Sequence, residues 1–236
     1  MASSDWSVTT NSIDNATIRS GVTSGLTPPN LGGSFVYGFN SRASGFEGAR
    51  VLKYIGDVNF DPVPSNFGGR ITGAVVRLPS GGLTGFAPFL YFSEQANTAD
   101  GEAYMLGLQD DDPSYIVLRK GVLSQGLPAG ILGENGILGK STSAIAAGTW
   151  VHLRLDVVVQ GTGDVLLQVF ENDVAANGVV SPIWTAVTGI ADFTDDTLGV
   201  NSGSLPITGG RVGFGMYAND ASRRAAFDQL TISRQL

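Results

Sequence analysis

The chain has 236 residues, 42% of them hydrophobic, which is long enough for one β-domain with a full core. It carries 14 Lys and Arg against 21 Asp and Glu, a formal net charge of -7. This balance excludes the basic surface with which proteins bind nucleic acids or anionic membranes. The sequence contains no cysteine, so disulfides and thiolate metal ligands are excluded and the fold must depend on burial and hydrogen-bonded strands.

Residues 1–33 are predicted to form an N-terminal arm. They are rich in Ser, Thr, Asn and Gly and contain few large apolar side chains, so they cannot form a core of their own. We expect the domain's own sheet or a neighbouring subunit to hold this arm in place. The start of the chain lacks the basic and apolar regions of a signal peptide, and no run approaches the roughly 18 apolar residues of a membrane span. These features predict a protein made in the cytoplasm.

Residues 34–236 are predicted to form a single domain of many short strands. The 33 glycines and 10 prolines interrupt the chain at short intervals, and no segment shows a sustained helical period. Such a pattern is typical of an all-β, two-sheet antiparallel jelly-roll sandwich. The predicted strands cover residues 34–39, 49–55, 70–78, 86–93, 102–109, 115–120, 150–159, 164–170, 211–218 and 225–233.

The strand at 150–159 shows the clearest alternation. Val151, Leu153, Leu155 and Val157 are predicted to face the core, whereas Trp150, His152, Arg154 and Asp156 face outward. In the last strand Phe227 and Leu230 are three residues apart, so both can face the core only if the strand contains an extra residue between them. This spacing predicts a β-bulge near Asp228 and Gln229.

Two connections, at 121–149 and 172–210, are predicted to project from the sandwich as loops. The first repeats the apolar triplet Ile-Leu-Gly around Glu134 and Asn135, which suggests a small hairpin. That hairpin either packs over its own domain or buries its apolar arms against another subunit, since an exposed apolar loop favours aggregation. The candidate interface residues are Trp6, Ile131, Leu132, Ile137, Leu138 and Trp184.

No catalytic, cofactor-binding or metal-binding residue is predicted. His152 is the only histidine, and without a G-x-S-x-G motif or a cysteine it has no nucleophile to activate. Asp110, Asp111 and Asp112 could supply oxygens to calcium, but three consecutive acids on one turn cannot all point inward, so a solvated turn is favoured.

Three segments carry a resemblance to a known family. They are Gly148–Val157 (GTWVHLRLDV), Gly210–Tyr217 (GRVGFGMY) and Ala225–Ile232 (AAFDQLTI). In this order they resemble the closing strands of concanavalin A-like (laminin-G-like) jelly-roll domains. Glucanases of that fold place three acids at alternate positions of one strand. Here Glu171 and Asp173 begin the pattern, but Ala175 and Ala176 occupy the place of the last acid. The resemblance therefore implies the architecture and no glucanase activity.

Two functions remain as hypotheses. The first is a non-catalytic structural protein of a bacteriophage particle, a capsid decoration, cement or tail-associated protein, located in the virion. It would bind sister subunits or other virion proteins and would form a homo-oligomer. This hypothesis depends on the absence of catalytic motifs and on a resemblance of residues 103–113 (AYMLGLQDDDP) to phage-borne laminin-G-like proteins. The second is a carbohydrate-binding lectin-like module that recognises a surface glycan.

Overall fold

The computed structural model describes most of the domain from residue 68 onward and short strands before it. The described residues are 6–10, 19–20, 37–40, 48–54, 68–77, 86–93, 101–109, 113–125, 127, 131–172, 181, 183–199, 202–218 and 224–235. None of them forms a helix with the length and apolar character needed to cross a membrane. The predicted turn at Asp110–Asp112 lies outside this part of the chain, as does most of the predicted N-terminal arm.

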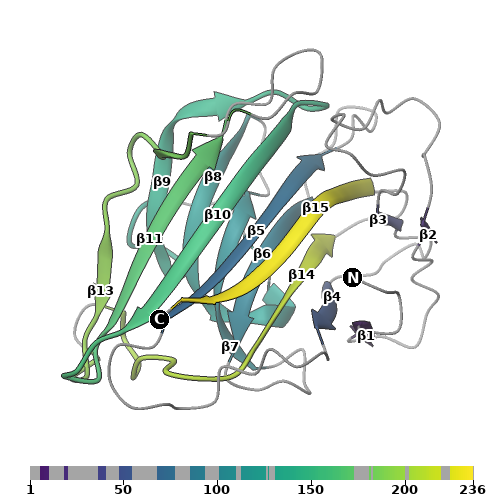
Figure 1. Cartoon of the computed structure of the whole chain (residues 1–236). Coiled ribbons are helices and arrows are strands. Elements are labelled where there is room, and N and C mark those ends of the chain that lie inside the picture. Colours follow the sequence, from purple (N-terminus) through teal and green to yellow (C-terminus); the bar gives the residue numbers. More distant parts are fainter. Residues whose placement is uncertain are drawn as a thin grey trace.

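Within the described residues the strands form two antiparallel sheets that stack face to face (Figure 1). The seven-stranded sheet runs in the order β1 (Trp6–Thr10), β4 (Gly48–Tyr54), β14 (Arg211–Ala218), β6 (Phe86–Ser93), β7 (Glu102–Leu108), β8 (Ser114–Val122) and β9 (Ile137–Ile145). The eight-stranded sheet runs β12 (Thr185–Ala186), β11 (Val165–Asn172), β10 (Trp150–Val159), β5 (Gly68–Arg77), β15 (Arg224–Gln235), β3 (Tyr37–Asn40) and β2 (Arg19–Ser20), with β13 (Phe193–Asp195) also paired to β11. This arrangement confirms the predicted all-β sandwich.

The main core fills the space between the sheets and follows the predicted alternation of β10. Val151, Leu153, Leu155 and Val157 all belong to the buried cluster between the sheets. From the other strands come, among others, Leu90, Tyr104, Leu118, Phe214 and Phe227. The predicted bulge is also confirmed, because the pairing of β15 with β5 shifts register between Asp228 and Thr231. That extra length keeps both Phe227 and Leu230 packed on the core.

Residues 121–149 do not form the projecting loop that the sequence predicts. They contain a 3-10 helix, η2 (Leu123–Gln125), and the strand β9, which pairs with β8. Ile137 is buried and Leu138 packs against the main core, so both belong to the domain's own packing. Of the four apolar interface candidates in this segment, Ile131 and Leu132 are exposed, at 63% and 64%. Within 172–210, β12 and β13 likewise extend the eight-stranded sheet.

A second apolar cluster lies on the outer face of the seven-stranded sheet. Phe89, Tyr91 and Met105 alternate with the residues of the main core along β6 and β7, so they point to the opposite side. Leu123 and Leu127 complete this cluster from the segment that follows β8. The buried guanidinium of Arg119 is bonded to the same segment, because Nε donates to the carbonyl of Asn135 (2.6 Å) and Nη2 to Gln125 Oε1 (2.7 Å). The part of this face formed by β6, β7 and β8 is therefore covered largely by apolar side chains.

A buried ion pair attaches the chain after β13 to β8. Lys120 Nζ lies 2.6 Å from Asp195 Oδ2, and the two side chains are 1% and 0% exposed. The ammonium also donates to the carbonyls of Ser204 (2.9 Å) and Leu205 (2.7 Å), while Tyr104 Oη donates to Asp195 Oδ2 (2.5 Å). Ser202 Oγ donates to Asp195 Oδ1, so every charged atom of the pair has a partner, which offsets the cost of burying the two charges.

We expect Lys120→Met to lower the free energy of unfolding by about 3–5 kcal/mol, because it leaves the Asp195 carboxylate buried without its cation. The double variant Lys120→Met/Asp195→Asn should recover part of the loss. Urea unfolding measures both. Lys140→Met, which removes a cation stacked on the Tyr115 ring at 4.3 Å, is the control and should cost less than about 1 kcal/mol. Equal losses in the two single variants would contradict the buried ion pair.

Candidate functional site

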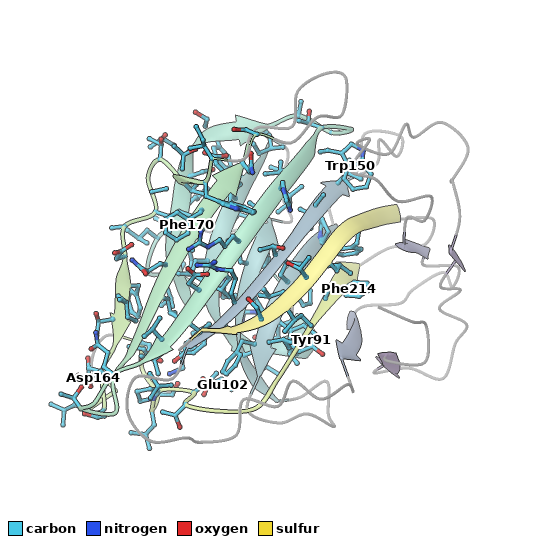
Figure 2. The ribbon with its side chains drawn as sticks, viewed as in Figure 1. Tyr91, Glu102, Trp150, Asp164, Phe170 and Phe214 are labelled. Atoms are coloured by element: carbon cyan, nitrogen blue, oxygen red, sulfur yellow. The ribbon has the colours of Figure 1, made fainter. Side chains whose placement is uncertain are left out.

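The outer face of the eight-stranded sheet carries the polar side chains of the candidate site. Antiparallel register aligns them in rows across the strands. In the first row, His152 of β10 lies opposite Asn172 of β11. In the second, Arg154 lies opposite Phe170, and in the third, Asp156 lies opposite Arg70 of β5. Figure 2 shows this sheet towards the viewer, with Trp150 near the upper end of β10 and Phe170 on β11.

Trp184 covers the first row. It directly precedes β12, whose Thr185 pairs with Glu171, and its half-buried indole lies against the imidazole of His152 with ring centroids 4.7 Å apart. As a result His152, predicted to face outward, is on the outer face but only 8% exposed. Its neighbour Asn172 is 5% exposed and donates from Nδ2 to the carbonyl of Ser181.

The first row contains buried polar atoms without hydrogen-bond partners. Among the residues that the structure describes, neither ring nitrogen of His152 has a hydrogen-bond partner, and nor does Oδ1 of Asn172. Buried polar groups are bonded in the large majority of cases, and leaving one unpaired costs about 1–3 kcal/mol. Burial also lowers the pKa of His152 from 6.5 to about 4. At neutral pH the imidazole is therefore uncharged and offers one donor and one acceptor.

The third row is an ion-pair cluster. Arg70 donates to the Asp156 carboxylate through Nε (2.7 Å) and Nη2 (2.8 Å). Arg154 donates to the same carboxylate through Nε (2.9 Å to Oδ1) and Nη2. Burial alone would raise the pKa of Asp156, but the hydrogen bonds from Arg70 and Arg154 outweigh it and hold the pKa below its usual value. Asp156 therefore stays ionised.

Arg154 connects the rows. Its guanidinium carbon lies 4.3 Å from the ring centroid of Phe170 and 5.8 Å from that of Trp184. The cation is thus stacked on one aromatic ring and close to another, an arrangement that both fixes its plane and stabilises its charge. The site therefore combines an indole, a neutral imidazole, a carboxamide and an oriented guanidinium.

The structure does not bring the predicted interface residues together. Trp6 lies in β1 and Ile137 in β9, at opposite edges of the seven-stranded sheet, whereas Trp184 belongs to the other sheet. A contact with another subunit through Ile131 and Leu132 stays a prediction. No group of three or more His, Cys, Asp or Glu side chains that could hold a metal occurs among the described residues.

Sequence reasoning missed the site although it placed several of its members on the outer face. The available signal was the polar set of β10, in which a histidine, an arginine and an aspartate alternate with core residues. The alternation predicts that these side chains face outward, which the structure confirms, but it does not predict that they are covered. Their burial depends on Trp184 and on the partners from β5 and β11, which no local pattern identifies.

No protein-family profile matches the sequence, and no curated protein is significantly similar to it. Among solved structures the chain is similar to a bifunctional GH43-CE protein from Bacteroides eggerthii, with 13% identity, a TM-score of 0.50, and coverage of 85% of this chain and 21% of that one. The chain thus spans about a fifth of that protein. It is also similar to the Emp46p carbohydrate recognition domain in its metal-free form (11% identity, 98% and 88% coverage, TM-score 0.49). A third similar structure is the carbohydrate-binding module CBM66 from Bacillus subtilis, with 12% identity, coverage of 97% of this chain and 95% of that one, and a TM-score of 0.43. At this identity the likeness concerns the fold alone, a jelly-roll sandwich as predicted.

We expect acid to destabilise the fold through His152. Its pKa is about 4 in the folded protein against 6.5 for the free side chain, so the unfolded chain takes up the proton first as the pH falls. Stability should therefore decrease between about pH 6.5 and 4, by up to roughly 3 kcal/mol, and then level off. His152→Gln should lack this component.

Because the chain has one histidine, its NMR titration reports this pKa directly, and urea unfolding across the same pH range measures the stability. A histidine pKa near 6.5 would show that water reaches the imidazole freely and would contradict the buried row.

Proposed function

We propose that this protein is a non-catalytic glycan-binding module whose binding surface is the outer face of the eight-stranded sheet around Trp184. The observation that carries the proposal is the half-buried indole of Trp184 beside the partly exposed guanidinium of Arg154, an aromatic surface next to hydrogen-bond donors. A sugar has hydroxyls that both donate and accept hydrogen bonds, and apolar C–H faces that stack on aromatic rings. It therefore satisfies both kinds of group at once.

The seven-stranded sheet supports this choice by contrast. Its outer face is occupied by Phe89, Tyr91 and Met105 beneath the segment that contains Leu123. Such a surface offers a ligand little polar recognition. Of the two outer faces, the polar one of the eight-stranded sheet is therefore the better binding surface for a hydroxyl-rich molecule.

The chemistry of the site supports binding without catalysis. Glycoside hydrolysis needs two carboxyl groups about 5–9.5 Å apart, one of which must carry a proton. Asp156 cannot serve as that acid because two guanidiniums hold it ionised. His152 is a poor general base at neutral pH, since its lowered pKa of about 4 makes the imidazole a weak proton acceptor.

The virion role that the sequence also suggested gains no support from the described residues. An assembly protein needs an extended contact surface, and the candidate residues for it are divided between two sheets and the core. The exposed pair Ile131 and Leu132 is too small to identify a partner. The glycan-binding alternative is for this reason the function that we propose.

Trp184→Ala should weaken glycan binding at least tenfold, because it removes the stacking surface and opens the first row to water. The measurement is retention of the purified protein by a panel of insoluble and immobilised polysaccharides, followed by titration with the best one. Tyr115→Ala, which removes a half-buried aromatic ring from the other sheet, is the matched control and should bind normally.

Both variants must melt as cooperatively as the parent for the comparison to hold. Failure of every polysaccharide in the panel to retain the parent protein would overturn the proposed function, as would full binding by Trp184→Ala.

A further inference from the structure

We propose that the glycan is acidic, and that Arg154 recognises a carboxylate on its pyranose ring. This inference rests on the proposed function and names the class of sugar. It follows from the guanidinium groups that the ion-pair cluster presents to the solvent, from the hydrogen-bonding capacity that Arg154 retains, and from the distance between that guanidinium and Trp184.

The ion-pair cluster presents guanidinium groups to the solvent. Those of Arg70 and Arg154 both bond to the single carboxylate of Asp156. The Asp156 side chain is 3% exposed, whereas those of Arg154 and Arg70 are 15% and 29% exposed. A ligand approaching this face therefore meets the arginine edges and not the carboxylate beneath them.

Arg154 retains an unused pair of donors. Its Nε and Nη2 bond to Asp156, and no described residue accepts a hydrogen bond from the two N–H groups of Nη1. Stacking on Phe170 at 4.3 Å and the bonds to Asp156 fix the plane of the guanidinium. A donor held in place before the ligand arrives loses little entropy on binding, and a guanidinium pairs with carboxylates better than with hydroxyls.

The same guanidinium is close to the stacking surface. Its carbon lies 5.8 Å from the ring centroid of Trp184, so a pyranose stacked on the indole can extend a ring carboxylate to Nη1. The formal charge of the whole chain is -7, so attraction of an acidic polymer must come from this local cluster.

The test compares acidic polysaccharides with their neutral methyl esters. Polygalacturonate, alginate and hyaluronan, each beside its methyl ester, are titrated against the protein at low and at high salt. Esterification keeps the sugar rings and removes the charge. We expect at least one acid form to bind more tightly than its ester at low salt, and this advantage to shrink at high salt because ions screen an exposed pair.

Arg154→Gln should lower the affinity for that acid form about tenfold or more and the affinity for the ester much less, so that the preference for the acid form is lost. The variant should fold, because Asp156 keeps both bonds from Arg70. Lys140→Gln makes the same change in net charge on β9 of the other sheet and should bind like the parent.

Equal binding of acid and ester, or an acid affinity that Arg154→Gln does not change, would overturn the inference. So would a failure to bind any of the three acid polymers. In each case the proposed function stands if a neutral polysaccharide is bound and Trp184→Ala weakens that binding. If no polysaccharide of either kind is bound, the proposed function fails as well.

Discussion

The antiparallel register that holds β10 between β5 and β11 determines both the core and the candidate site. Because side chains alternate along a strand, the pairing that directs Leu153 and Leu155 into the core directs His152 and Arg154 to the other face. A slip by one residue would bury the arginine between the sheets and expose the leucines. The hydrophobic effect thus fixes the position of the polar rows as firmly as that of the core.

The two outer faces of the sandwich show what a connecting segment can do to a sheet. The segment that follows β8 covers one face with Leu123 and Leu127, and Arg119 bonds it in place. On the other face Trp184, which precedes β12, lies over His152 in the first row. Arg154 and Arg70 remain partly accessible. The two faces therefore differ in how much of each sheet the described connecting residues cover.

The sequence predicted the fold wherever local alternation was strong. The bounds of β6, β10 and β14 agree with the predicted ranges. The bulge in β15 follows from the odd spacing of Phe227 and Leu230, which both pack on the core. β9 was missed because after Ile137 its residues include Gly139 and the polar run Ser141 to Ser143, which lack the alternation of a half-buried strand.

The candidate site was missed for a different reason. His152 is separated from Trp184 by more than thirty residues, and only the pairing of β12 with β11 brings the two rings together. Likewise, the carboxylate of Asp156 obtains its second guanidinium from β5, far earlier in the chain. Contacts of this kind are set by topology, which a local pattern of residue types does not encode.

Two ion clusters among the described residues differ in how far burial leaves their cations accessible. Lys120 and Asp195 are almost completely buried, and the ammonium is surrounded by carbonyl and hydroxyl oxygens. Nothing in that cluster remains to meet a ligand, so its effect is to hold the chain after β13 against β8. At Asp156 the acid is equally buried, but its two arginines reach the surface. A buried acid of this kind orients partly exposed guanidiniums at the candidate site.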